Sequence, residues 1–92
     1  MRLYEGKAGG FYAVEEISRE KLGEEWTKRM KALGLMKGAV LLLLNKKKSG
    51  AAAVKVRGTR LALGRKLTES IEICPLEEKK AELKERGRRT VG

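Results

Sequence analysis

The chain has 92 residues, of which 22 are basic and 12 acidic; its net charge is +10, and it contains one cysteine and no histidine. One cysteine excludes an internal disulfide, and the lack of histidine removes the commonest general base and the commonest transition-metal ligand. The length suits one small domain, and the apolar run over 39–44 is far shorter than the ~20 residues that span a bilayer. We therefore expect one domain without a membrane span, in a reducing compartment.

The basic residues are concentrated in the middle of the chain. No acidic residue occurs between Glu25 and Glu69, and every charged residue of that stretch is lysine or arginine. A surface built from this stretch is electropositive and attracts nucleic acid, acidic protein surfaces or anionic membranes without specificity. The alternative is a solvated basic surface that has no dedicated partner.

A strand followed by a helix is predicted for the first third of the chain. Residues 11–17 are rich in β-forming side chains. Four apolar side chains then recur at the spacing of one helical face, which we expect to pack on the core: Leu22, Trp26, Met30 and Leu33. Gly34 stands where a left-handed C-cap ends a helix, and Leu35 stands where a hydrophobic contact accompanies such a cap.

Residues 39–45 predict a second strand, and both of its faces are apolar. Side chains alternate between the two faces of a strand, so this strand divides into two sets. We expect one set in the core, namely Val40, Leu42 and Leu44. The other set, Leu41 and Leu43, is expected to point outward, where it would meet a partner.

Three more strands are predicted at 51–57, 60–63 and 70–74, and a connecting turn at 64–69. The only proline, Pro75, cannot donate to a ladder and marks the end of the sheet. Residues 76–86 are good helix formers with a narrow apolar side.

These elements predict a mainly β fold. Five short strands with regular turns form a small SH3-like barrel, with one helix after the first strand. We expect residues 1–75 to form this barrel domain and residues 76–92 to form a charged C-terminal tail that is partly helical.

Four stretches in this order resemble the FeoA family. They are LYEGKAGGFYAVEEI, MKALGLMKGAVLLLL, VKVRGTRLALGRK and ESIEI, and together they cover residues from Leu3 to Cys74. The most specific element is the join of helix, Gly-Leu-x-x-Gly and strand, together with Val-Arg-Gly. Two positions depart from the family pattern, because Ala8 and Lys37 stand where many members have proline before glycine.

The resemblance implies a function as well as a fold. FeoA proteins are small cytoplasmic partners of the ferrous iron transporter FeoB, and the same module occurs at the C-terminal end of iron-dependent repressors. The resemblance therefore implies a non-enzymatic accessory protein of iron uptake that contacts the cytoplasmic GTPase domain of FeoB.

The residues themselves predict neither catalysis nor metal binding. Neighbouring carboxylates such as Glu15 and Glu16 point to opposite faces of a strand and do not form a catalytic pair. Iron(II) sites in proteins combine histidine with carboxylates, and histidine is absent. Cys74 ends a strand and is interpreted as an ordinary small apolar residue. We expect no catalytic residue, no metal site and no cofactor.

A partner-binding surface is the remaining hypothesis. Its candidate residues are Lys37, Leu41, Leu43, Lys55, Arg57 and Arg60. One alternative is a small basic barrel that binds RNA or DNA, although the scarcity of aromatic residues argues against base stacking and no specific nucleic acid is expected. Another is a homo-oligomer, in which the edge strands of an open barrel pair and the outward leucines add an apolar patch.

Overall fold

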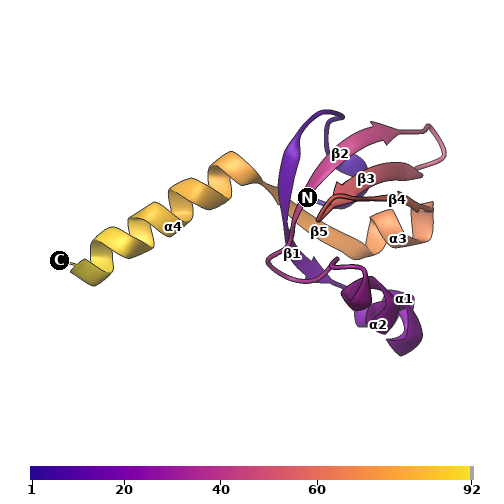
Figure 1. Cartoon of the computed structure of the whole chain (residues 1–92), viewed down its shortest axis with the longest axis horizontal. Helices are drawn as coiled ribbons and strands as arrows, with labels where there is room; N and C mark the ends of the chain where they lie inside the picture. Colours follow the sequence, from indigo (N-terminus) through magenta and orange to yellow (C-terminus); the bar gives the residue numbers. More distant parts are fainter. Residues whose placement is uncertain (92) are drawn as a thin grey trace.

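The computed structural model describes residues 1–91, with side chains described for 1–18, 20 and 22–83. Within these residues five strands form one antiparallel sheet in the order β4-β3-β2-β1-β5, and the sheet is strongly curled (Figure 1). The elements in chain order are η1 (Leu3–Glu5), β1 (Phe11–Ile17), α1 (Arg19–Leu22), α2 (Glu24–Ala32), β2 (Val40–Lys46), β3 (Ala52–Val56), β4 (Thr59–Leu63), α3 (Arg65–Ser70), β5 (Ile71–Pro75) and α4 (Leu76–Val91). The predicted mainly β architecture is therefore confirmed.

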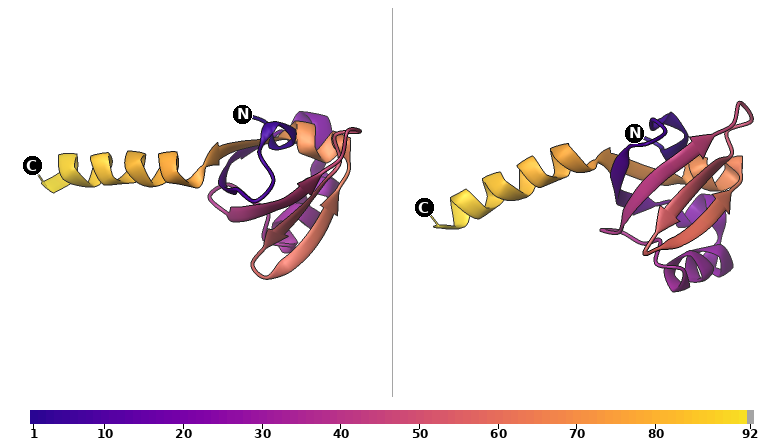
Figure 2. Two further views of the ribbon diagram at one scale, coloured as in Figure 1. Left: turned by 90° about the horizontal axis from the view of Figure 1, so that it is seen from above. Right: turned by 45° about the horizontal axis from the view of Figure 1, so that its top comes forward.

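The helices occupy different places around the sheet. Helices α1 and α2 lie together at one end of it, and α4 points away from it in both views of Figure 2. This projection contributes to a longest extent of 46 Å, against 28 and 23 Å along the other axes. The first turns of α4 still contact β1, since Lys79 Nζ lies 3.4 Å from Glu15 Oε1.

The core lies on the inner side of the curled sheet. It is almost entirely aliphatic, and its largest fully buried side chains are Leu3, Met30, Leu35, Leu41, Leu43, Ile71, Ile73, Val54 and Val56. Leu41 and Leu43 are 1% and 0% exposed, whereas Val40 is 45% exposed. The predicted facing of this strand is therefore wrong, and Leu41 and Leu43 do not lie on the surface.

A β-bulge explains the reversed facing. β2 pairs with β3 through Leu43 and Val54, and then through Asn45 and Ala53, so Leu44 is an extra residue without a partner. A regular ladder continued from Asn45 would place Leu44 opposite Val54, on the inner side. Because side chains alternate with a period of two, counting back from Asn45 across the extra residue gives the opposite facing for Leu41 and Leu43, whereas their pairing with Val56 and Val54 places them inward.

The predicted end of the helix is confirmed in detail. Gly34 has φ +92°, and its N–H donates to the carbonyl of Lys31 at 3.0 Å. The Leu35 N–H donates to the carbonyl of Met30 at 2.8 Å, which completes a Schellman motif. Leu35 is fully buried, so the turn fixes the end of α2 to the core.

The predicted apolar stripe of this helix is only half correct. Leu22 and Met30 are buried, but Trp26 and Leu33 are 44% and 45% exposed. Gly23, whose φ is +82°, separates α1 from α2, so Leu22 belongs to a different helix from the other three, and within α2 only Met30 is buried. Trp26 instead lies under the Arg29 guanidinium, 5.6 Å from the ring centre.

Candidate partner-binding site

A row of side chains crosses the outer side of four strands. Phe11 of β1 pairs with Leu42 of β2, Leu42 pairs with Lys55 of β3, and Lys55 pairs with Arg60 of β4. Directly opposite residues of antiparallel strands point to the same face. Together with Val40, the neighbour of Leu42 on that face of β2, these residues are called the outer row below.

The outer row has an apolar half and a basic half. Phe11 is 55% exposed, more than any other aromatic residue that is described, and Val40 is 45% exposed. Leu42 lies half-buried between them and the basic half, where Lys55 and Arg60 are exposed. The surface therefore changes from apolar over β1 and β2 to cationic over β3 and β4.

No acidic side chain of β2, β3 or β4 neutralises the basic half, because these strands contain no aspartate or glutamate. Among the described residues, no ion pair and no side-chain hydrogen bond includes Lys55 or Arg60. The ion pairs that do occur lie elsewhere, such as Arg65 with Glu69 at 2.7 Å on α3. That pairing raises the pKa of Arg65, through its hydrogen bond to Glu69 above all. The positive charge of the outer row is therefore available for another molecule.

Arg57 does not join the outer row. It is the first residue of a two-residue turn between β3 and β4, and its φ of +51° with Gly58 at +79° is typical of a type I′ hairpin turn. Its side chain lies back over the end of α2, since a Cβ built on Gly34 would stand 2.9 Å from Arg57 Cδ. The Arg57 side chain therefore lies against the turn at Gly34, although the residue as a whole is exposed.

Lys37 lies at a different opening of the molecule. It is exposed in the loop between α2 and β2 and lines a pocket of about 310 Å³ that Lys31, Leu35 and Glu16 also line. The structure thus unites Lys55 and Arg60 from the predicted site, separates Lys37 and Arg57 from them, and buries the two leucines. Phe11 and Val40 were missed, because only the strand register places them on the same face as Lys55 and next to Leu42, which pairs with it.

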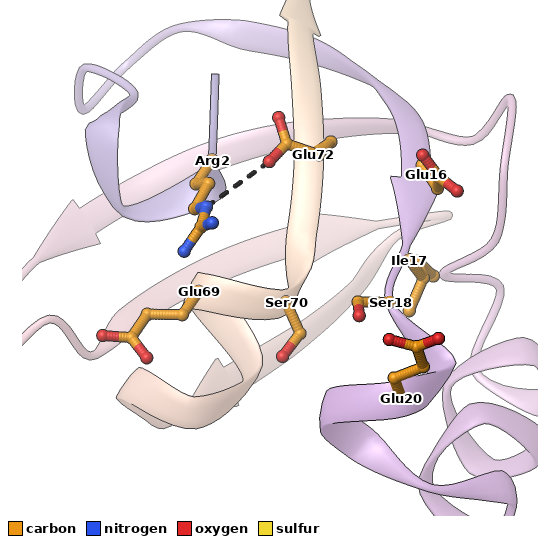
Figure 3. Close-up of a pocket in the computed structure, with 8 residues that line it drawn as sticks. All are labelled: Arg2, Glu16, Ile17, Ser18, Glu20, Glu69, Ser70 and Glu72. Carbon is orange, nitrogen blue, oxygen red and sulfur yellow. Dashed lines mark ion pairs between the residues drawn. The ribbon is translucent and has the colours of Figure 1, made fainter.

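A larger pocket, of about 550 Å³, has an acidic lining (Figure 3). Its walls come from β1, α1, α3 and β5 and include the carboxylates of Glu16, Glu20, Glu69 and Glu72. Glu72 is paired with Arg2 Nε at 3.5 Å. Among residues whose side chains are described, no group of three or more His, Cys, Asp or Glu is arranged to hold a metal ion.

The single cysteine lies at the outer side of β5. Cys74 is half-buried, and its Sγ lies 3.9 Å from Glu78 Oε2 at the start of α4. Burial raises the pKa of the Cys74 thiol, and the carboxylates of Glu15 and Glu78 raise it further. The thiol is therefore protonated at neutral pH and is a poor nucleophile.

No helix within residues 1–91 combines the length and the apolar character that crossing a membrane requires.

Solved structures define the class of this fold. A zinc-bound FeoA from Stenotrophomonas maltophilia, described as a prokaryotic SH3 domain protein, matches with a TM-score of 0.68 over 80% of this chain and 89% of that chain, at 24% identity. The manganese regulator SloR matches with a TM-score of 0.67 over 82% of this chain and 34% of that chain, at 21% identity. The predicted SH3-like class is confirmed.

The family follows from the sequence. The FeoA domain matches residues 1–75. The solution structure of FeoA from Chlorobium tepidum is 31% identical, with a TM-score of 0.69 over 83% of this chain and 70% of that chain. This chain belongs to the FeoA family. No match was found among curated proteins.

Proposed function

We propose that this protein is a non-enzymatic, cytoplasmic accessory protein of ferrous iron uptake that binds the cytoplasmic GTPase domain of a FeoB-type transporter. Membership of the FeoA family supports the connection with iron transport. The Stenotrophomonas maltophilia relative is itself described as a candidate activating factor of bacterial ferrous iron transport. Binding of the transporter is the step that goes beyond the family.

The outer row is the observation that carries this proposal. It offers an exposed aromatic side chain, two aliphatic side chains and two cations on adjacent strands. Protein interfaces are enriched in aromatic and arginine side chains, with an apolar centre and a polar rim. Because these residues stand on paired strands, their backbone positions are already fixed before a partner arrives, which lowers the entropic cost of association.

The test is binding of the purified protein to the cytoplasmic domain of FeoB from the same host, measured across a salt series with a random DNA duplex as competitor. The proposal predicts saturable binding that survives the competitor. Robust binding to the duplex, with none to the FeoB domain, would contradict it and favour the nucleic-acid alternative. A steep fall in duplex affinity with salt would then indicate phosphate contacts alone.

A further inference from the structure

We infer that the outer row recognises an acidic protein segment that places an apolar side chain next to its carboxylates. This inference rests on the proposed function for the identity of the partner, and it goes further by naming the face used and the chemistry it selects. The segment lies across the strands, with its apolar side chain over Phe11 and Leu42 and its carboxylates over Lys55 and Arg60.

The basic half has the geometry of a carboxylate site. Lys55 and Arg60 are directly opposite each other on paired strands, so their Cα atoms are about 5 Å apart and their side chains leave the same face. One carboxylate, or two from neighbouring residues, then meets both cations. The guanidinium of Arg60 binds a carboxylate through two parallel hydrogen bonds, and the Lys55 ammonium adds a second charge.

The apolar half gives the segment a direction. Phe11 and Val40 are about half exposed, and Leu42, which adjoins both, is partly covered. Neighbouring strands lie about 4.8 Å apart, so the row from Phe11 to Arg60 spans three such steps. A segment with an apolar side chain at one end and carboxylates at the other matches this row in only one orientation.

Nucleic acid and membrane fit the row less well. Phe11 is the sole aromatic side chain in it, and the aliphatic Val40 and Leu42 offer no stacking platform for bases. A membrane anchor needs a broad face of protruding apolar side chains, whereas the exposed apolar side chains of the row are only Phe11 and Val40, and Leu42 is half-buried. An acidic protein segment uses both halves of the row.

The first experiment compares association kinetics with the FeoB cytoplasmic domain for three proteins: the wild type, Lys55→Glu with Arg60→Glu, and the control Lys28→Glu with Lys66→Glu. The control residues are exposed on α2 and α3, and both double variants lower the net charge equally. At low salt we expect the first variant to lower the association rate constant at least ten-fold and the control less than three-fold. We also expect Phe11→Ser to raise mainly the dissociation rate constant.

The second experiment does not depend on FeoB. The probe is a synthetic peptide of six glutamates and one leucine, added to the full chain and followed by amide NMR. The inference predicts shift changes centred on Phe11, Leu42, Lys55 and Arg60 that are lost in the Lys55→Glu, Arg60→Glu variant. The dispersed spectrum of that variant also serves as the control for folding.

The outcomes separate the two proposals. If the peptide perturbs the outer row while the FeoB domain does not bind, the proposed function is wrong and the acidic recognition stands. If the FeoB domain binds, both double variants associate at equal rates and the peptide leaves the row unperturbed, the inference is wrong and the function stands. A shift pattern centred on Lys37 and Lys31 would also overturn it.

Discussion

The two sides of the same strands differ in what they contact. On the inner side Leu41, Leu43, Val54 and Val56 are at most 1% exposed. On the outer side Phe11, Val40 and Leu42 remain exposed or half-buried, and the cations of β3 and β4 have no partner among the described residues. The inner side chains are therefore used in folding, whereas the outer ones are available for binding. Stability and partner binding are thus expected to respond to different substitutions.

The largest effect is expected on the inner side. Leu43→Ala removes most of a fully buried side chain from the centre of the core and is expected to lower the free energy of unfolding by about 2–5 kcal/mol. Urea denaturation followed by circular dichroism measures the loss. A loss below about 1 kcal/mol would place Leu43 outside the core and contradict the comparison.

A smaller loss of stability is expected at Gly34, where the Arg57 side chain lies against the turn after α2. Gly34→Ala forces an L-residue to adopt φ +92°, which destabilises the folded state by about 1–2 kcal/mol. The added Cβ would also stand only 2.9 Å from Arg57 Cδ. Gly38→Ala is the matched control, since its φ is +89° and its Cβ would meet nothing within 4 Å. We expect Gly34→Ala to be the more destabilising of the two by denaturation. Equal losses would show that Arg57 moves aside freely and does not belong to the folded framework.

A third substitution sharpens the comparison within one strand. Leu42 is half-buried, so Leu42→Ala removes less apolar surface from contact and is expected to cost about 1 kcal/mol, well below its neighbour Leu43. The same urea experiment decides this. A cost equal to that of Leu43→Ala would mean that both sides of β2 belong to the core.

The smallest effect on stability is expected from the charges of the outer row. Lys55→Glu with Arg60→Glu removes no described ion pair and is expected to change the free energy of unfolding by no more than about 0.5 kcal/mol. If the same double variant also loses binding to its partner, the outer side contributes to binding and not to stability. A large loss of stability would show instead that the basic half supports the fold.

Local signals made most of the fold predictable. Gly34 and Leu35 predicted the end of α2, because a C-cap depends on a few consecutive residues. The five strands followed from β-forming runs between glycine-rich turns. The facing of β2 was not predictable in this way, since both of its sides are apolar and the extra residue at Leu44 interrupts the alternation between Leu43 and Asn45.

The candidate site was predictable only in part, because a local pattern does not show which distant strands pair. Lys55 and Arg60 stand out as cations on either side of a short turn, which is a local pattern. Phe11 lies far away in the sequence and joins them only through the pairing of β1 with β2. In the sequence Arg57 is indistinguishable from Lys55 and Arg60. In the structure its positive φ places its side chain over Gly34, away from the outer row.

The bulge at Leu44 also has a consequence for how β2 can change in length during evolution. Because Leu44 has no partner on β3, deleting it would leave Leu43 opposite Val54 and Asn45 opposite Ala53, so the residues on either side would keep their facing. Deleting Leu42 would instead shift the preceding residues by one position relative to β1. Alignments of relatives that are one residue shorter here are thus expected to place the gap at Leu44.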